Sequence, residues 1–154
     1  MAYSIRKAAV IGAGTMGSGI AALLAGVGVP TVLLDIPGKD TTPDSPFKER
    51  NAPALNGVQR LKKSLKSKRP EVYHVDDLNL ISIGNTEDHL DKLSDADWVV
   101  EVVIEKLDIK RALFGKLQEV VKPDAILSTN TSGLPIADIA EGMGNDFTCR
   151  FMGT

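Results

Sequence analysis

VIGAGTMGSGIA, residues 10–21, is the stretch that decides the predicted fold. Its glycines separate two different hydrophobic patterns. The run before them, residues 7–11, is short, apolar and closed by a glycine, which is typical of a buried strand. In the run after them the apolar residues have helical spacing, so we expect a helix over 15–28. The apolar positions and the terminating glycines of this helix are Ile20, Leu23, Leu24, Val27, Gly26 and Gly28.

The same change of pattern repeats along the rest of the chain. TVLLD at 31–35 predicts a second buried strand, and the proline-rich, polar residues 36–56 predict a surface loop. A basic amphipathic helix is expected over 57–69, with Val58, Leu61 and Leu65 inward and Pro70 as its stop. Four more strands are expected at 78–84, 97–105, 125–130 and 146–153. Two more helices are expected, at 107–121 with Ile109, Leu113 and Leu117 on one stripe, and from near Pro135.

These elements together predict the fold class. Strands separated by helical crossovers pair in parallel, and near-continuous apolar strands indicate a sheet that is covered on both faces. A length of 154 residues suits one domain. We therefore predict an α/β fold, a Rossmann-type doubly wound parallel sheet that forms a single domain over residues 1–154.

The glycine turn itself predicts a binding site for a dinucleotide. Gly12 permits the tight turn, Gly14 lets the backbone approach a pyrophosphate, and Gly17 lets the helix pack close to the strand. The helix N-terminus adds free N–H groups and a partial positive charge. The predicted cofactor loop consists of Gly12, Ala13, Gly14, Thr15, Met16 and Gly17.

An acidic residue at the end of the second strand specifies the dinucleotide. Asp35 lies near the spacing of roughly 20 residues after the glycines at which a carboxylate binds the adenosine ribose hydroxyls. It would repel the additional phosphate of NADP, and no arginine follows it until Arg50. The sequence therefore favours NAD over NADP. Proteins that only sense NAD also carry this unit, so it indicates binding and not chemistry.

Polar residues also follow the fourth and fifth strands, where ligands of a doubly wound sheet bind. STNTSG at 128–133 supplies hydroxyls and an amide, with Asn130 and Ser132 among them, for a nicotinamide ribose or a substrate oxygen. Taken alone, it also fits an ordinary turn between strand and helix. Glu105 and Lys110 could flank the nicotinamide ribose, and equally they fit an acid at a helix start and a solvated lysine.

Composition excludes several other classes of protein. A net charge of −2 gives no general attraction to nucleic acid or to anionic membranes, and no apolar run reaches the roughly 20 residues of a membrane span. The single cysteine, Cys149, leaves no internal disulfide or cysteine-based zinc site, and we expect it to be a buried, inert thiol within the last strand. We expect a cytoplasmic protein that binds neither metal nor nucleic acid.

Four stretches, GAGTMGSGIA, VVEVVIEKLDIKRALFGKL, ILSTNTSGLPI and RFMGT, resemble the NAD-binding domain of the L-3-hydroxyacyl-CoA dehydrogenases. The resemblance covers almost the whole chain and is weakest over 37–79. The stretch 101–132 followed by RFMGT is its most specific part. The extended region 36–70 resembles bacterial chains in which an enoyl-CoA hydratase follows the dehydrogenase.

The resemblance implies an activity and a set of residue roles. The activity is NAD-dependent oxidation of (S)-3-hydroxyacyl-CoA to 3-ketoacyl-CoA in fatty-acid β-oxidation. Asp35 would bind the adenosine ribose, Glu105 and Lys110 would lie along the cofactor, and Ser132 would touch both the nicotinamide and the substrate's 3-oxygen. Asn130 would share that turn as a second catalytic residue, and Lys68 in the basic segment 60–69 would contact coenzyme A.

A base for the hydroxyl proton is also required, and histidine often supplies it. His74 and His89 do not follow strand ends, so we expect surface roles for them. In the family, a catalytic histidine follows the pair that matches Gly153 and Thr154. We therefore expect a fragment that lacks this base and the helical second domain, and that binds NAD(H) without turnover. The full-length protein is expected to be a homodimer.

Two other readings stay open from the sequence. A non-catalytic NAD-sensing domain explains Gly12 to Asp35 and the missing base, but not STNTSG followed by RFMGT. The cofactor domain of another small hydroxy-acid dehydrogenase explains the glycine motif without using the basic segment for coenzyme A. Chain-length preference and a fused hydratase domain cannot be read from these residues.

Overall fold

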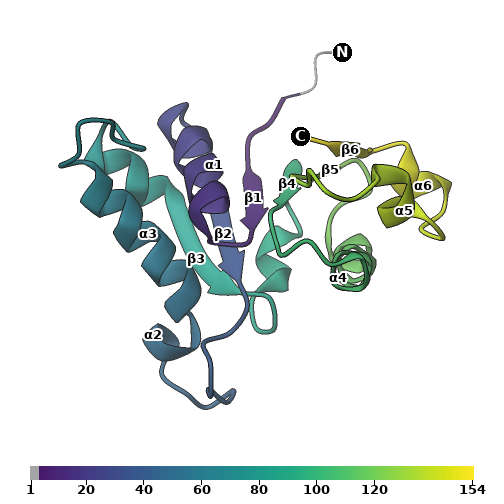
Figure 1. Ribbon diagram of the computed structural model, residues 1–154, viewed down its shortest axis with the longest axis horizontal. Helices are drawn as coiled ribbons and strands as arrows, with labels where there is room; N and C mark the ends of the chain where they lie inside the picture. The colour runs from purple at the N-terminus through teal and green to yellow at the C-terminus, as the bar shows by residue number, and fades with distance from the viewer. Residues whose placement is uncertain (1–3) are drawn as a thin grey trace.

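A computed structural model describes residues 4–154, and its centre is a six-stranded, all-parallel sheet in the order β3-β2-β1-β4-β5-β6. Three strands lie on each side of the point between β1 and β4 where the chain order reverses (Figure 1). This is the predicted doubly wound α/β fold. The strands are β1 (Ala8–Ile11), β2 (Thr31–Asp35), β3 (Ile81–Asn85), β4 (Trp98–Glu101), β5 (Ile126–Thr129) and β6 (Phe151–Gly153).

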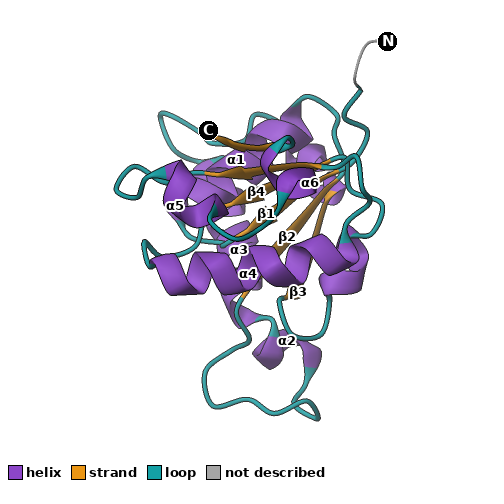
Figure 2. Ribbon diagram, turned by 90° about the vertical axis from the view of Figure 1, so that its right-hand side faces the viewer, coloured by secondary structure: helices purple, strands orange, loops and turns teal. Residues whose placement is uncertain are grey.

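Helices cover both faces of this sheet. The longer ones are α1 (Thr15–Gly26), α3 (Ala52–Ser64) and α4 (Leu107–Val120); the short ones are α2 (Phe47–Arg50), α5 (Ile136–Ala140), α6 (Asn145–Thr148), η1 (Val75–Leu80) and η2 (Leu90–Leu93). Helices α1 and α3 lie on one side of the sheet, and α4, α5 and α6 lie on the other (Figure 1). Figure 2 shows α4 running across its own face of the sheet.

The residues of β1 are apolar throughout because they face hydrophobic cores on both faces of the sheet. Ala8 and Val10 belong to the hydrophobic core under α1 and α3, whereas Ala9 and Ile11 belong to the core under α4, α5 and α6. All four are fully buried. Because successive side chains of a strand point to opposite faces, a strand covered on both faces must be apolar throughout.

The region after β2 differs from the predicted loop. Residues 36–56 contain α2 and the start of α3, and Pro53 occupies the first turn of α3. A proline in the first turn costs no backbone hydrogen bond, so the prolines that suggested a loop are compatible with helix starts.

The same helix ends earlier than predicted. It stops at Ser64, well before Pro70, although Leu61 is buried and Val58 and Leu65 pack against the core as expected. The Ser64 hydroxyl donates to the Leu61 carbonyl and accepts the Glu71 N–H, at 2.7 and 3.1 Å. Serine competes in this way with the helical hydrogen bonds, and the chain turns back.

The last predicted strand, 146–153, is only half strand. Its first half is α6, whose Phe147 packs against Phe151 and Phe114 with ring centroids 4.6 and 5.5 Å apart. Cys149 is exposed, so the expectation of a buried thiol was wrong. Strand β4 is also shorter than predicted and ends at Glu101, and β3 begins three residues later than predicted.

Among residues 4–154, no helix is long and apolar enough to span a membrane.

Candidate functional site

A cleft of about 650 Å³ opens where the chain order of the sheet reverses, at the carboxyl ends of β1, β4 and β5. The glycine loop and the first turn of α1 form one wall, and the segments after β4 and β5 form the other. Ligands of open α/β sheets bind at this position. The lining residues are Gly14, Thr15, Met16, Gly17, Val102, Val103, Glu105, Asn130, Thr131, Ser132 and Thr154.

Each of the three motif glycines suits its position for a different structural reason. Gly12 has a φ of +109°, and a side chain there would collide with the Val102 carbonyl group. A side chain at Gly17 would collide with the Gly12 carbonyl oxygen, which shows how closely α1 packs on the turn. Gly14 faces open space, with nothing within 4 Å of an added Cβ atom. The loop therefore leaves room for a ligand over Gly14 and over the free N–H groups of the first helical turn.

Asp35, at the end of β2, is bonded directly to this loop. Its Oδ2 accepts the N–H of Ala13 at 2.6 Å, and its Oδ1 accepts the N–H of Ile36 at 2.7 Å. Two backbone N–H groups thus hold the half-buried carboxylate at the start of the glycine turn. A carboxylate held there retains free lone pairs for the hydroxyls of a ribose.

Arg60 on α3 also contacts the loop, and sequence reasoning missed it. Its Nη2 donates to the Gly14 carbonyl at 2.6 Å and lies 3.4 Å from the Ala13 carbonyl. The helix can approach because residue 57 is a glycine, since an added Cβ there would lie 2.6 Å from the Ser18 hydroxyl. The usable signal was a glycine and an arginine three apart, which lie on the same face of a helix.

The opposite wall is organised by Glu105. Its carboxylate accepts the Thr131 hydroxyl at 2.5 Å and the Ser132 N–H at 3.1 Å. The Thr131 hydrogen bond, helped by the Ser132 N–H and the nearby Lys110, lowers the pKa of the Glu105 carboxyl. Asn130 donates from Nδ2 to the Thr154 carbonyl at 2.8 Å. Glu105, Asn130 and Ser132 thus meet in the cleft, as the sequence predicted for neighbouring strand ends.

Lys110 lies differently from the solvated lysine that one reading of the sequence suggested. Its side chain is fully buried, and its Nζ donates to both oxygens of Glu101 at 2.7 and 2.9 Å. Its Nζ is 3.8 Å from the nearer Glu105 oxygen. The lysine lies behind the wall of the cleft, and Glu101, a second buried charge, was not identified from the sequence.

Neither histidine borders the cleft. His74 is exposed, as expected, beside the groove between α1 and residues 70–77. His89 is half-buried, and its Nδ1 accepts the Asn85 N–H at 3.1 Å. Lys68 is exposed beyond the end of α3 and does not line the cleft.

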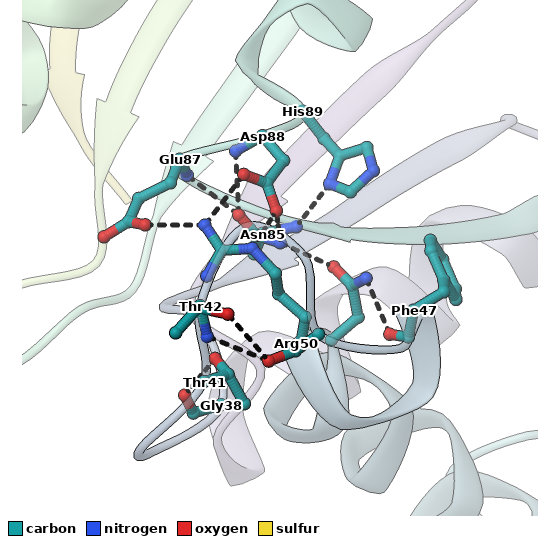
Figure 3. A network of polar contacts seen from close by, with 11 residues as sticks. Gly38, Thr41, Thr42, Phe47, Arg50, Asn85, Glu87, Asp88 and His89 are labelled. Atoms are coloured by element: carbon teal, nitrogen blue, oxygen red, sulfur yellow. Dashed lines mark hydrogen bonds and ion pairs between the residues drawn. The ribbon is translucent and has the colours of Figure 1, made fainter.

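A polar network ties the segment after β2 to the carboxyl end of β3 (Figure 3). The buried guanidinium of Arg50 bonds Asp88 at 2.5 and 2.8 Å and Glu87 at 2.8 Å. The ion pair with Arg50 lowers the pKa of Asp88 to about 2. Asn85 donates to both Asp88 and Asn51, at 2.8 and 2.9 Å. The network anchors the chain next to Asp35, because Asn85 and Asp35 are partners in the β2–β3 pairing.

The chain matches the model of a known protein family over nearly its whole length. The family model "3-hydroxyacyl-CoA dehydrogenase, NAD binding domain" matches residues 7–153. A probable 3-hydroxyacyl-CoA dehydrogenase of Deinococcus radiodurans is 49% identical over 149 residues, which is 97% of this chain and 40% of that protein. A protein of the same description from Bacillus subtilis is 43% identical over 155 residues, 97% of this chain and 20% of that protein. The chain thus spans less than half the length of these relatives.

Solved structures agree with the sequence comparison. The crystal structure of 3-hydroxybutyryl-CoA dehydrogenase from Escherichia coli K12 matches with a TM-score of 0.74 and 32% identity, over 97% of this chain and 29% of that one. The (S)-3-hydroxybutyryl-CoA dehydrogenase of Ralstonia eutropha matches with a TM-score of 0.69 and 31% identity, over 97% and 48%.

Proposed function

Because this chain belongs to the NAD-binding domain family of the 3-hydroxyacyl-CoA dehydrogenases, we propose that it serves the oxidation of (S)-3-hydroxyacyl-CoA to 3-ketoacyl-CoA. Its cofactor is NAD, as the family assignment shows. When bound, NAD accepts the hydride from the substrate carbon. The observation that carries the proposal is the cleft in which the glycine loop faces Glu105, Asn130 and Ser132.

The residues fit the adenosine half and the diphosphate of the cofactor. Gly14 is open to an approaching diphosphate, and the first turn of α1 supplies N–H donors. Asp35 would accept the adenosine ribose hydroxyls. An apolar hollow of about 240 Å³, lined by Ile36, Ile109 and Leu113 among others, lies just after Asp35 and suits the adenine ring.

The second wall fits the nicotinamide half. Glu105 and the 130–132 turn lie across the cleft from the glycine loop. We assign Ser132 to the nicotinamide and to the substrate's 3-oxygen, since its hydroxyl can donate to one and accept from the other. Asn130 belongs to the same turn. Lys110 supports this wall from behind through Glu101 and Glu105.

The basic segment 60–69 is the proposed contact for coenzyme A. The first residue of this segment, Arg60, touches the glycine loop, so the segment begins beside the cleft. The positive side chains after Arg60 are exposed and can bind phosphate groups, and Lys68 is the proposed contact. These side chains are Lys62, Lys63, Lys66, Lys68 and Arg69. An acyl-CoA would thus extend from the cleft along α3. Homodimer formation and a cytoplasmic location of the whole protein remain predictions.

Titration by calorimetry tests the cofactor assignment on the purified chain. We expect saturable binding of NADH and much weaker binding of NADPH, because Asp35 would repel the additional phosphate. A folded circular-dichroism spectrum must accompany the measurement. A folded chain that binds neither nucleotide, or that prefers NADPH, would contradict the proposal.

A further inference from the structure

We propose that Glu101 is a positioning residue for the nicotinamide side of the cleft. The inference rests on the proposed function, because it concerns the wall to which the nicotinamide half is assigned. Glu101 is the last residue of β4 and is fully buried, so it touches neither solvent nor a ligand in the cleft. Its influence on the site must pass through the groups that its carboxylate holds.

The Glu101 carboxylate joins three separate segments that form or support this wall. Oε1 accepts the Val103 N–H at 2.6 Å, which fixes the turn after β4. Oε2 accepts the Thr129 hydroxyl at 2.6 Å, at the end of β5 and one residue before the 130–132 turn. Both oxygens accept the Lys110 ammonium of α4.

The backbone of Glu101 adds a fourth link. Its carbonyl accepts the Asn130 N–H at 2.8 Å, so the first residue of the polar turn is tied to the same residue. One buried residue thereby sets the relative position of the strand ends that carry Val103 and Asn130.

A chain of charges continues from Glu101 to the surface of the cleft. Lys110 bonds Glu101 on one side and lies 3.8 Å from Glu105 on the other. Glu105 in turn holds the Thr131 hydroxyl and the Ser132 N–H. Each neighbouring pair in this chain is joined by an ion pair or a hydrogen bond, so we expect a displacement of Lys110 to move Glu105 and, through Glu105, Ser132.

Stability alone is a weak reason for this arrangement. Two charges buried together repay their loss of hydration only when the geometry is very good, and an apolar pair of similar volume is often at least as stable. A buried pair that also orients polar groups in a cleft has a second role. We therefore expect the loss of Glu101 to affect ligands that reach the 130–132 turn more than ligands that do not.

Two probes separate these ligands. NADH spans both walls, whereas ADP carries only the adenosine and the diphosphate. We expect the folded Glu101→Gln variant to bind NADH about tenfold more weakly than the wild-type chain, and ADP within about twofold. The amide keeps the shape of the carboxylate but not its charge, so Lys110 loses the nearer of its two carboxylate partners and keeps only Glu105 at 3.8 Å.

A matched control lies just before the other end of the same strand. Asp97 is also a buried carboxylate paired with a lysine, Lys122, but it lies at the end of the sheet remote from the cleft. Asp97→Asn should lower stability while the ratio of the NADH and ADP dissociation constants stays unchanged. If Glu101→Gln only loosened the fold in general, the ratio of the two dissociation constants would change in both variants or in neither.

Thr129→Val provides the test if Glu101→Gln does not fold. It removes one hydrogen bond to Glu101 and introduces no charge, and we expect about threefold weaker NADH binding with ADP unaffected. Equal binding of NADH and ADP by the wild-type chain, or equal losses for both ligands in the variants, would overturn the inference alone. A wild-type chain that binds neither ligand would refute the proposed function, and the inference with it.

Discussion

Asp35 shows how much a single residue can specify. Its carboxylate is held by the Ala13 and Ile36 N–H groups and keeps lone pairs for the adenosine ribose that we assign to it. We expect Asp35→Asn to weaken NADH binding about tenfold, because a charged acceptor is replaced by a neutral amide. The discrimination against NADPH should narrow in the same variant. Calorimetry with both nucleotides measures the two effects.

The matched control for this substitution is Asp40→Asn. Asp40 is exposed and has a φ of +58°, a conformation that asparagine tolerates. Its replacement should leave both affinities unchanged. Unaltered NADH affinity in the Asp35→Asn variant would remove Asp35 from the site.

At the scale of the element, a buried acid, Asp97, immediately precedes β4. Asp97 accepts the N–H groups of Arg6 and Lys7 at 2.6 and 3.0 Å and is paired with Lys122. The Lys122 ammonium, together with these two N–H groups, lowers the pKa of Asp97 from 3.8 to about 2. The contribution of this acid to stability is therefore complete above its unfolded pKa and is lost as the pH falls toward the folded pKa.

The direction of this pKa shift predicts how the stability of the protein depends on pH. The free energy of unfolding should fall between pH 4 and pH 2, the window set by 3.8 and about 2. Asp97→Asn should be less stable at neutral pH and should show a smaller fall over that window. Urea unfolding at several pH values tests this, with Asp44→Asn in the exposed segment after β2 as the control. An undiminished fall in the Asp97→Asn variant would contradict the assignment.

At the scale of the whole molecule, the described residues form a cleft at the carboxyl ends of β1, β4 and β5 whose lining contains no histidine. His74 lies beside a different groove, and His89 is engaged with Asn85. Hydride transfer from an alcohol needs a base for the hydroxyl proton. In the reverse direction the same group must return a proton to the ketone oxygen. Under the proposed function we expect the 154-residue chain to bind NADH and to show no NADH oxidation with acetoacetyl-CoA above background. Turnover that rises in proportion to the concentration of pure chain would contradict this expectation.

The sequence was sufficient where the physical cause is local. Three features have their causes in a few neighbouring residues. They are a glycine with a φ of +109° at position 12, a glycine in the first turn of α1 at position 17, and a carboxylate at the end of β2. The doubly wound sheet could be predicted for the same reason, because continuous apolar strands and helical spacing are visible along the chain. Glu105, Asn130 and Ser132 could be placed in one cleft, since parallel strands end at the same edge.

Tertiary structure decided the contacts between residues far apart in the sequence. The Arg60 hydrogen bond to Gly14 and the burial of Lys110 against Glu101 depend on which helix packs on which strand. Periodicity identifies the face of an element that is buried, but it does not identify the partner that this face meets. The same limit made Cys149 a wrong prediction, because the residues before it form the helix α6 and Cys149 follows that helix in an exposed turn. The sequence by itself thus determined the fold class and the glycine turn, and only the packed molecule determined how the wall opposite that turn is held.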